Sequence, residues 1–528
     1  MPLREARRSR PRTELVLDLR GGGQNDHQDN PAECRRAYPS TDRRVQAISN
    51  NRERTRRDQR TALRRAIGSR GRRFERGGKK RGFAEAFATE ILSEIESLVG
   101  PAIDEWDFEA IEVAARREAL RVAGMAVAKR LNADGSDHRA VALPCPRCGG
   151  PARYAGRRDK TFTTVLGEMT LSRAYYYCHH CEAGFCPRDQ HLGFRDGSLS
   201  PHVLRMVGIV GGRVSFQEGH QLLAELAGIG VETKHIEREA EKLGAEFLQD
   251  EKLVVEADSS GPLPATLYVG LDGTGVPMRK SELVDRSGKQ DDGSAKTREV
   301  KLVTVWSAEG RDEEGMPVRD EGSVSYSAAI ESAATLDTDT DLSEFAKRVE
   351  REALRRRFQQ APRQAVIGDG APWIWNIASE LFPDAIHIVD RYHVNERLGT
   401  VGKAIYGPGT ELAEHCTHQR CTELKAGNLD AVLAALSSHF SVKEARECKK
   451  YLQTNRHRMR YDKFHAAGLC TSSAVVESGC KRAVGLRLKQ GGMFWTVAGA
   501  NAILALRCCR LSGRFEDFWE RRALRPTG

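Results

Sequence analysis

The chain has 528 residues, 40% of them apolar and 30% charged, a composition typical of a soluble globular protein with two to four domains. No apolar run approaches the ~20 residues that span a bilayer, and no signal-type segment opens the sequence, so we expect neither a membrane protein nor a secreted one. The net charge of +10 is uneven, because residues 1–82 hold 24 Lys and Arg against 10 Asp and Glu. Thirteen cysteines without a secretion signal favour a reducing compartment, where clustered thiols bind metal.

The N-terminal region divides at about residue 83. Residues 1–82 have few apolar side chains and several arginine clusters, which predicts a basic disordered tail that attracts polyphosphates. A plain solvated tail and a mis-assigned start codon are the alternatives. Phe83–Val99 and Trp106–Leu131 then carry apolar residues at helical spacing around Gly100-Pro101. They predict a helical segment over residues 83–140, suited to docking or dimerisation.

Two Cys-x-x-Cys knuckles give the clearest local signal. Each turns two thiolates toward one point, and four thiolates complete a tetrahedral zinc site with no open position, so the site is structural. Between the knuckles, Thr161–Leu166 and Met169–Tyr177 predict two strands paired around Gly167-Glu168. We therefore predict a zinc ribbon over residues 141–198 that binds nucleic acid or braces neighbouring domains. Its ligands are Cys145, Cys148, Cys178 and Cys181, with Cys186, His179 or His180 as substitutes.

Residues 199–255 predict a helical pair. Ser215 and Glu218 form a capping-box pattern at the start of one helix, and Gly228-Ile-Gly230 ends it. Thr233 can cap a second helix running to about Phe247. The arrangement resembles a DNA-binding helix-turn-helix, although any helical hairpin would give the same pattern.

Two buried strands that each end in an aspartate mark the centre of the chain. Thr266–Leu271 is followed by Asp272, and Ala365–Gly368 is followed by Asp369. With strands at Val300–Trp306 and Ala385–Val389 and helices at Asp341–Phe358 and Trp373–Leu381, the order predicts an α/β core over residues 262–392. The interval from Ala308 to about Thr340 is expected to be irregular.

The remaining chain predicts helices. Residues 393–468 are expected to form a helical insertion, and residues 469–520 to return to the core. Thr471-Ser-Ser473 can cap a helix that carries Glu477 and a basic strip including Lys481 and Arg482. Regular helical spacing places Glu477, Lys481, Val484 and Leu488 on one face. Beyond Trp495, the C-terminal helix is expected to pack on the sheet.

Three carboxylates therefore stand out as metal ligands: Asp272, Asp369 and Glu477. If the two strands are neighbours and the later helix crosses them, the three acids converge. An oxygen cage of this kind suits Mg2+ or Mn2+, and two such ions activate the attacking oxygen and stabilise the leaving oxygen in phosphoryl displacement. The alternative is that these acids bind no metal and only cap turns.

The sequence resembles the ISKra-type insertion-sequence transposases of bacteria over about residues 83–520. The likeness rests on four segments: CPRCGG…CHHCEAGFCPRD, LDGTGVP, VIGDGAPWIWNIASELFPDAIHIVDRYHV and ESGCKRAVGLRLKQGGMFW. It implies a DDE transposase with an RNase H-like mixed sheet, a catalytic triad of Asp272, Asp369 and Glu477, and two Mg2+ ions. It also implies that His393, in an Asp-x-x-His element, positions the substrate. Lys481 and Arg482 are expected to hold the DNA backbone.

The resemblance also sets expectations for partners and location. The expected partner is double-stranded DNA, as terminal inverted repeats and as target, bound in the bacterial cytoplasm at the nucleoid by a homodimer or larger assembly. Two alternatives stay open: an inactive or domesticated zinc-ribbon DNA-binding protein, and a stand-alone RNase H-like nuclease. Viewed without the family, the sequence favours a packing or capping role for His393 over a functional one.

Overall fold

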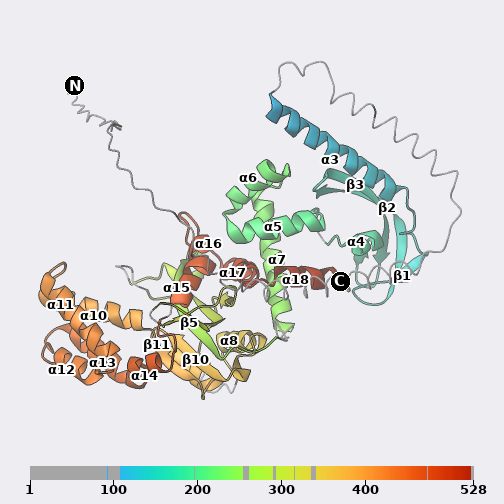
Figure 1. Ribbon diagram of the computed structural model, residues 1–528. Coiled ribbons are helices and arrows are strands. Elements are labelled where there is room, and N and C mark those ends of the chain that lie inside the picture. Colours follow the sequence, from blue (N-terminus) through green and yellow to red (C-terminus); the bar gives the residue numbers. More distant parts are fainter. Residues whose placement is uncertain are drawn as a thin grey trace, which may run out of the picture. The chain divides into compact units, whose positions relative to one another are not determined.

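The computed structural model describes residue 92 and residues 107–524, except for 196, 254–260, 289, 291–292, 314, 335–340 and 473. By its internal contacts the chain divides into two units, Met1–Ala84 and Glu85–Gly528. The basic tail predicted for residues 1–82 lies outside the described residues, as does nearly all of the helix predicted at Phe83–Val99. Everything below concerns the second unit (Figure 1).

An antiparallel four-stranded sheet, in the order β1-β2-β3-β4, forms the ribbon. The predicted hairpin is confirmed, but its turn is at Val165-Leu166 rather than at Gly167-Glu168. The Thr164 hydroxyl stabilises that turn by accepting from the Leu166 N–H and donating to the Gly167 carbonyl. The elements of this region are α3 (Phe108–Asn132), β1 (Ala142–Pro144), β2 (Pro151–Thr164), β3 (Gly167–Cys178), β4 (Ala183–Phe185) and α4 (Pro187–Leu192).

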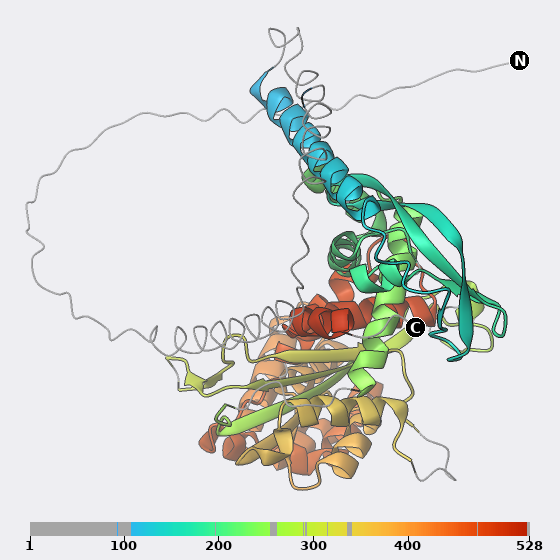
Figure 2. The ribbon, with the colours of Figure 1, turned by 90° about the vertical axis from the view of Figure 1, so that its right-hand side faces the viewer.

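Three helices follow: α5 (Pro201–Arg213), α6 (Phe216–Ala227) and α7 (Thr233–Leu253). The Ser215 hydroxyl caps α6 by accepting from the Glu218 N–H, as predicted, and Gly228 ends it at φ 69°. Helix α7 runs six residues past its expected end because its C-terminal half is buried against α17 (Val497–Leu511). At their crossing, a Cβ on Gly244 would lie 2.2 Å from the Ala502 carbonyl oxygen, so only glycine fits (Figure 2).

The central sheet has five strands in the order β11-β10-β5-β6-β9. Strands β5, β6 and β9 are antiparallel neighbours, whereas β10 and β11 run parallel to β5. The α/β class is therefore confirmed as a mixed sheet with many helices. The strands are β5 (Thr266–Pro277), β6 (Thr297–Ser307), β9 (Ser325–Ala329), β10 (Arg363–Gly368) and β11 (Ile386–Val389); β7 (Gly310–Arg311) and β8 (Pro317–Val318) form a separate pair.

Two hydrophobic clusters enclose this sheet. One joins β5, β10 and β11 to α8 (Glu344–Arg355), α9 (Pro372–Leu381) and the helices after residue 391. The other joins β6 and β9 to α5, α7 and α17, so the C-terminal helix packs on the sheet as predicted. Short turns of helix, η2 (Lys280–Glu282) and η3 (Phe358–Gln360), complete this part.

The segment between β11 and the last sheet-packing helices is helical, in line with expectation. The two ends of this segment lie side by side, because the Arg391 N–H donates to the Thr471 carbonyl over 3.0 Å. Its elements are α10 (Arg391–Tyr406), α11 (Glu411–Lys425), α12 (Leu429–Ser437), α13 (Lys443–Thr454), η4 (Arg456–Arg458) and α14 (Tyr461–Ala466). After the chain returns come α15 (Ala474–Gly479), the π-helical η5 (Cys480–Gly485), α16 (Leu486–Leu488), α17 and, last, α18 (Phe515–Leu524).

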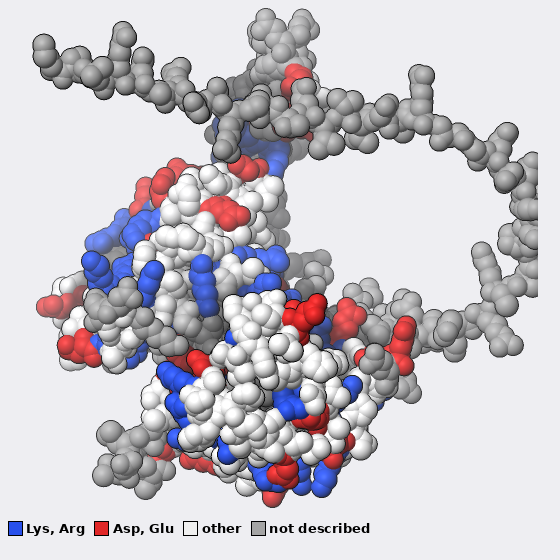
Figure 3. Space-filling view, turned by 90° about the vertical axis from the view of Figure 1, so that its left-hand side faces the viewer, with Lys and Arg blue, Asp and Glu red and all other residues white. Residues whose placement is uncertain are grey.

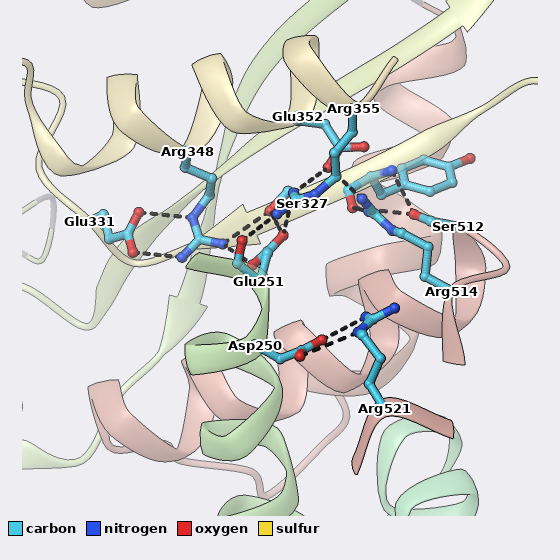
Figure 4. Close-up of polar contacts among 11 residues, drawn as sticks. Asp250, Glu251, Ser327, Glu331, Arg348, Glu352, Arg355, Ser512, Arg514 and Arg521 are labelled. Atoms are coloured by element: carbon cyan, nitrogen blue, oxygen red, sulfur yellow. Dashed lines mark hydrogen bonds and ion pairs between the residues drawn. The ribbon is translucent and has the colours of Figure 1, made fainter. Parts of the chain in front are cut away.

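A buried ion-pair network ties α7 to α8, β9 and the start of α18 (Figure 4). Arg348 donates to Glu331 over 2.7 Å and to Glu251 over 3.0 Å, and Arg514 donates to Glu352 over 2.9 Å. Burial alone would raise the pKa of Glu352, but the charges of Arg514 and Arg355 hold it at about 2. The surrounding arginines likewise lower the pKa of Glu251 against the effect of burial, and the network fixes the end of α7 against the sheet.

Within the described residues, no helix is long and apolar enough to cross a membrane. Lys and Arg are interspersed with Asp and Glu over the face drawn in Figure 3 and do not cover it continuously. This matches the sequence, in which the basic excess is concentrated in residues 1–82.

Candidate metal centres

The two cysteine knuckles meet at the end of the ribbon. Cys145 and Cys148 flank the β1–β2 turn, and Cys178 and Cys181 flank the β3–β4 turn. The Sγ atoms of Cys145 and Cys181 lie 3.5 Å apart, and those of Cys148 and Cys178 lie 3.6 Å apart. Tetrahedral zinc with bonds of about 2.3 Å requires sulfur separations of about 3.8 Å, so the four residues fit a structural metal such as zinc.

The four thiols are the one group of three or more His, Cys, Asp or Glu among the described residues whose ligand atoms all lie within 4.8 Å of one another. Burial opposes ionisation of Cys145, but N–H groups of Arg147 and Cys148 outweigh it and lower the pKa of that thiol to about 7. The substitute ligands are outside the group: Cys186 is buried at the start of α4, and His179 and His180 are exposed. The cluster is therefore made of the four knuckle cysteines alone.

The second candidate centre lies where β5 and β10 run side by side. These strands are parallel neighbours with Leu271 opposite Gly368, so the next residues, Asp272 and Asp369, emerge at the same level of the sheet. The pKa of Asp272 is raised, chiefly by burial and further by the charge of Asp369. Hydrogen bonds from the Cys480 thiol and the Gly273 N–H act in the opposite direction but do not outweigh this rise. The two carboxylates therefore lie close enough to interact electrostatically.

The backbone around Asp369 is closely held. Its Oδ1 accepts from the Ala371 N–H over 2.8 Å, and its carbonyl accepts from the Tyr451 hydroxyl over 2.7 Å. Gly370 has φ 94°, and a Cβ there would lie 2.6 Å from the Tyr451 ring. Only glycine satisfies both the left-handed backbone and this contact, so Tyr451 and Gly370 fix the direction of the Asp369 side chain.

His393 lies beside the same pair of acids. Asp390 follows β11, caps α10 by accepting from the Tyr392 N–H over 2.9 Å, and is almost fully buried. The His393 Nε2 is 3.7 Å from the Asp390 Oδ2, and its charge lowers the pKa of Asp272. His393 therefore lies near both Asp390 and Asp272.

The helix that carries Glu477 packs directly on β5. A Cβ on Gly270 would lie only 2.1 Å from the Val476 Cγ2, and the Cys480 thiol contacts Asp272. Glu477 itself is exposed, one residue after Val476 and three before Cys480. Asp272, Asp369 and Glu477 do not bring one carboxylate oxygen each to within 4.8 Å of one another. Asp272 accepts from the Gly273 N–H and Asp369 from the Ala371 N–H.

The helix face expected for Glu477, Lys481, Val484 and Leu488 is wrong. Glu477 and Lys481 are exposed, whereas Val484 and Leu488 are buried, because the wider π-helical turn at Cys480–Gly485 holds more residues per turn and breaks the regular α-helical spacing between them. Arg482 is exposed too, while its carbonyl accepts from the Arg507 Nε over 2.6 Å. The side chains of Lys481 and Arg482 are therefore exposed to solvent on the turn that follows Glu477.

Two residues near the carboxylates were not anticipated from the sequence: Tyr451 and Cys480. Lys489 belongs to the basic strip expected on the Glu477 helix, and its Nζ donates to the Thr274 hydroxyl, two residues beyond Asp272. Tyr451 comes from α13 and is far from β5 in sequence, so no local spacing could have linked it to Asp369. The glycine after Asp369 was the only available signal, since a strand ending in Asp-Gly predicts a close approach by another element.

No protein-family model matches the chain, and no curated protein sequence matches it either. Among solved structures, the Drosophila P element transposase strand transfer complex is similar at 10% sequence identity and a TM-score of 0.22, over 63% of this chain and 83% of that one. A TM-score this low supports no structural argument. The function must therefore be inferred from the site itself.

Proposed function

We propose that this chain is a metal-dependent enzyme that cleaves DNA phosphodiester bonds, with Asp272, Asp369 and Glu477 as its acids. Within that class, we propose a DDE transposase of an insertion sequence, which cuts element ends and transfers the freed strand to target DNA. The observation that carries the proposal is the placement of Asp272 and Asp369 at one level of two parallel strands, with the Glu477 helix packed on the same strand.

The donor set fits divalent ions of the magnesium type. All three side chains offer carboxylate oxygens, which Mg2+ and Mn2+ prefer. Burial and the neighbouring Asp369 charge raise the pKa of Asp272, so a cation at this point would relieve an existing electrostatic cost. Two bound ions supply activation of the attacking oxygen and stabilisation of the leaving oxygen.

The order of the sheet supports an RNase H-like core. Three antiparallel strands (β9, β6, β5) are followed by two parallel ones (β10, β11), and the aspartates lie at the junction of the two groups. Ligands in sheets with parallel strands bind outside the carboxyl ends of those strands, where Asp369 is found. The helical insertion at residues 391–466 adds Tyr451 to this edge.

The chain's own residues have distinct roles in the proposed reaction. Asp272 and Asp369 would bind the ions, with Tyr451 fixing the backbone of Asp369. His393, next to Asp272, would orient the scissile phosphate. After a water cleaves the phosphodiester and frees a 3′-hydroxyl, that hydroxyl attacks target DNA in the same site, and no covalent enzyme intermediate forms. Glu477 completes the acid set.

The remaining surface would hold DNA. Lys481 and Arg482 project from the helix turn that follows Glu477 and would contact the phosphate backbone, which gives binding that falls with salt. The ribbon with its structural zinc and the α6–α7 pair are proposed to grip terminal repeats. Pairing of two element ends implies a dimer or larger assembly, acting at the bacterial nucleoid.

The decisive experiment replaces Asp369 by Asn and follows Mg2+-dependent nicking of a labelled terminal-repeat duplex. We expect loss of cleavage with DNA binding retained, whereas Asp384→Asn, an exposed acid in the turn before β11, should cleave like wild type. Cleavage by Asp369→Asn near the wild-type rate would refute the site. A wild-type protein that shifts the duplex without cutting it would indicate the DNA-binding alternative, and cutting without strand-transfer products the stand-alone nuclease.

A further inference from the structure

One face of the β2–β3 hairpin collects aromatic and basic side chains that the proposed cleavage reaction does not use. We call it the hairpin face. On β3, Tyr175 and Tyr177 are two residues apart and so point to the same side. Across the pairing, Arg153 lies opposite Tyr177 and Arg158 lies opposite Arg173. The hairpin face comprises Arg153, Arg158, Lys160, Tyr175 and Tyr177.

A β-bulge is what brings the two arginines to one side. Positions 153 and 158 differ by an odd number, so a regular strand would place them on opposite faces. The register shifts between Tyr154 and Arg157, where β2 has one more residue than the facing part of β3. Gly156, within this bulge, has φ 95°. Bulges of this kind re-aim side chains, and here the bulge aligns Arg153 and Arg158 with the two tyrosines.

The hairpin face is hollowed in two adjoining places that share Arg158 and Tyr175. A hollow of about 480 Å³ is lined by Arg153, Arg158, Tyr175, Tyr177 and His179, among others. The next, of about 810 Å³, extends past Lys160 to α4, α7 and α18. Because they share these two residues, the hollows adjoin in one depression along the hairpin face, and each volume lies within the range of about 300–1,000 Å³ typical of ligand sites.

The depression carries a net positive charge, because its basic side chains outnumber its acidic ones and each acid is already in an ion pair. The three acids of the larger hollow already have cationic partners: Asp189 pairs with Arg173, Glu239 with Lys242, and Glu246 with Arg522. Among the described residues, neither Arg153 nor Arg158 is within ion-pair distance of an acid. Their charges are therefore available to phosphates, which bind cationic grooves with release of counterions.

The aromatic rings are held in place and half-exposed. The Arg158 guanidinium lies 3.6 Å from the centroid of the Tyr175 ring, and His179 meets Tyr177 edge-on at 5.0 Å. Tyr175 rests on Gly184, where a Cβ would lie 2.0 Å from the hydroxyl. Planar groups fixed along a basic groove are what unpaired bases stack on, whereas the bases of a duplex are already stacked on each other.

We propose that the hairpin face binds a single-stranded stretch of nucleic acid, with unpaired bases on Tyr175 and Tyr177 and phosphates on Arg153, Arg158 and Lys160. The inference goes beyond the proposed cleavage reaction and needs none of its residues. If both hold, the face would take up unpaired strand next to the duplex that is cut.

The test measures anisotropy of a fluorescent oligothymidine with the full-length protein, with Ca2+ in place of Mg2+ and without chelator so that zinc is kept. Tyr177→Leu removes the ring and should weaken binding at least about fivefold, the lower end of the loss for one stacked base, whereas Tyr177→Phe should bind like wild type. Tyr406→Leu, a partly exposed tyrosine on α10, is the matched control and should not change affinity.

A second pair of variants separates charge from stacking. Arg153→Ala should reduce the slope of log affinity against log salt by about 0.7, the value for one phosphate on a single strand. Arg158→Lys keeps the charge but loses the planar contact with Tyr175, so it should weaken binding and leave that slope unchanged. Zinc content equal to that of wild type shows that each variant ribbon is folded.

Two outcomes would overturn the proposal. If folded Tyr177→Leu and Arg153→Ala both bind oligothymidine like wild type, the hairpin face is not the site. If Tyr177→Leu loses affinity equally for a duplex of the same length, the face binds double-stranded DNA without stacking. The assay involves no cleavage, so its failure is distinct from failure of the Asp369→Asn experiment.

Discussion

Gly270→Ala tests whether the position of the Glu477 helix on β5 matters for catalysis. A new Cβ would lie 2.1 Å from Val476 Cγ2 and 2.8 Å from both Thr304 Oγ1 and Trp306 Cζ3. Carbon atoms in contact are separated by about 3.5 Å or more, so Val476 must retreat by about 1.4 Å. Overpacking of this kind costs about 1–3 kcal/mol of folding stability, and a misplacement of about 1 Å at a reacting centre costs about 100-fold in rate.

The assay combines thermal unfolding with Mg2+-dependent nicking of the labelled duplex. We expect Gly270→Ala to remain folded at the assay temperature while cleavage falls by about two orders of magnitude. Adding Val476→Ala removes the closest colliding atom and should restore part of the rate. Gly261→Ala, at a glycine with no atom within 4 Å of the new Cβ, is the control. A folded Gly270→Ala enzyme that cleaves within threefold of wild type would refute the idea that this helix completes the site.

Two further predictions concern the zinc cluster and the buried ion pairs. Cys148→Ser should lower bound zinc, measured by metal analysis, to well under one per chain, whereas Cys186→Ser should keep it; equal zinc in both variants would contradict the assignment. Glu352→Gln should lower the free energy of unfolding, measured by urea denaturation at pH 7, by about 3–5 kcal/mol, because Arg514 and Arg355 lose a buried ion-pair partner. The folded pKa of Glu352, about 2, lies below the value for the unfolded chain, so its contribution is complete above about pH 4.5 and is lost as the pH falls toward 2. The variant should therefore lose less stability than wild type over that range, and an equal loss would argue against the ion pairs.

Local patterns in the sequence identified most of the individual elements. The strands before Asp272 and Asp369 were visible as short β-branched runs, and the cysteine cluster followed from knuckle spacing alone. In these cases, the residues that set the structure are neighbours in sequence. The pairing of β5 with β10 had to be assumed, since it joins strands about 100 residues apart.

The misses have a common physical origin in contacts between distant segments. Strand β9 falls in the charged interval from Ala308 to about Thr340 that was expected to be irregular, yet Ser327 is buried where its hydroxyl donates to Glu251 at the end of α7. Strand β5 continues to Pro277 past its expected end because β6 remains paired with it. The π-helical turn was likewise invisible in the sequence, where regular spacing predicted one continuous face for Glu477 and Leu488.

The position of α15 after the helical insertion has a consequence for protein synthesis. A nascent chain released before residue 474 would contain both aspartates and the zinc ribbon but neither the Glu477 helix nor α17, which covers β9 and packs against α7. If the proposed activity is right, incomplete translation products could still occupy DNA yet not cut it. Cleavage as proposed would then require a chain translated through both α15 and α17.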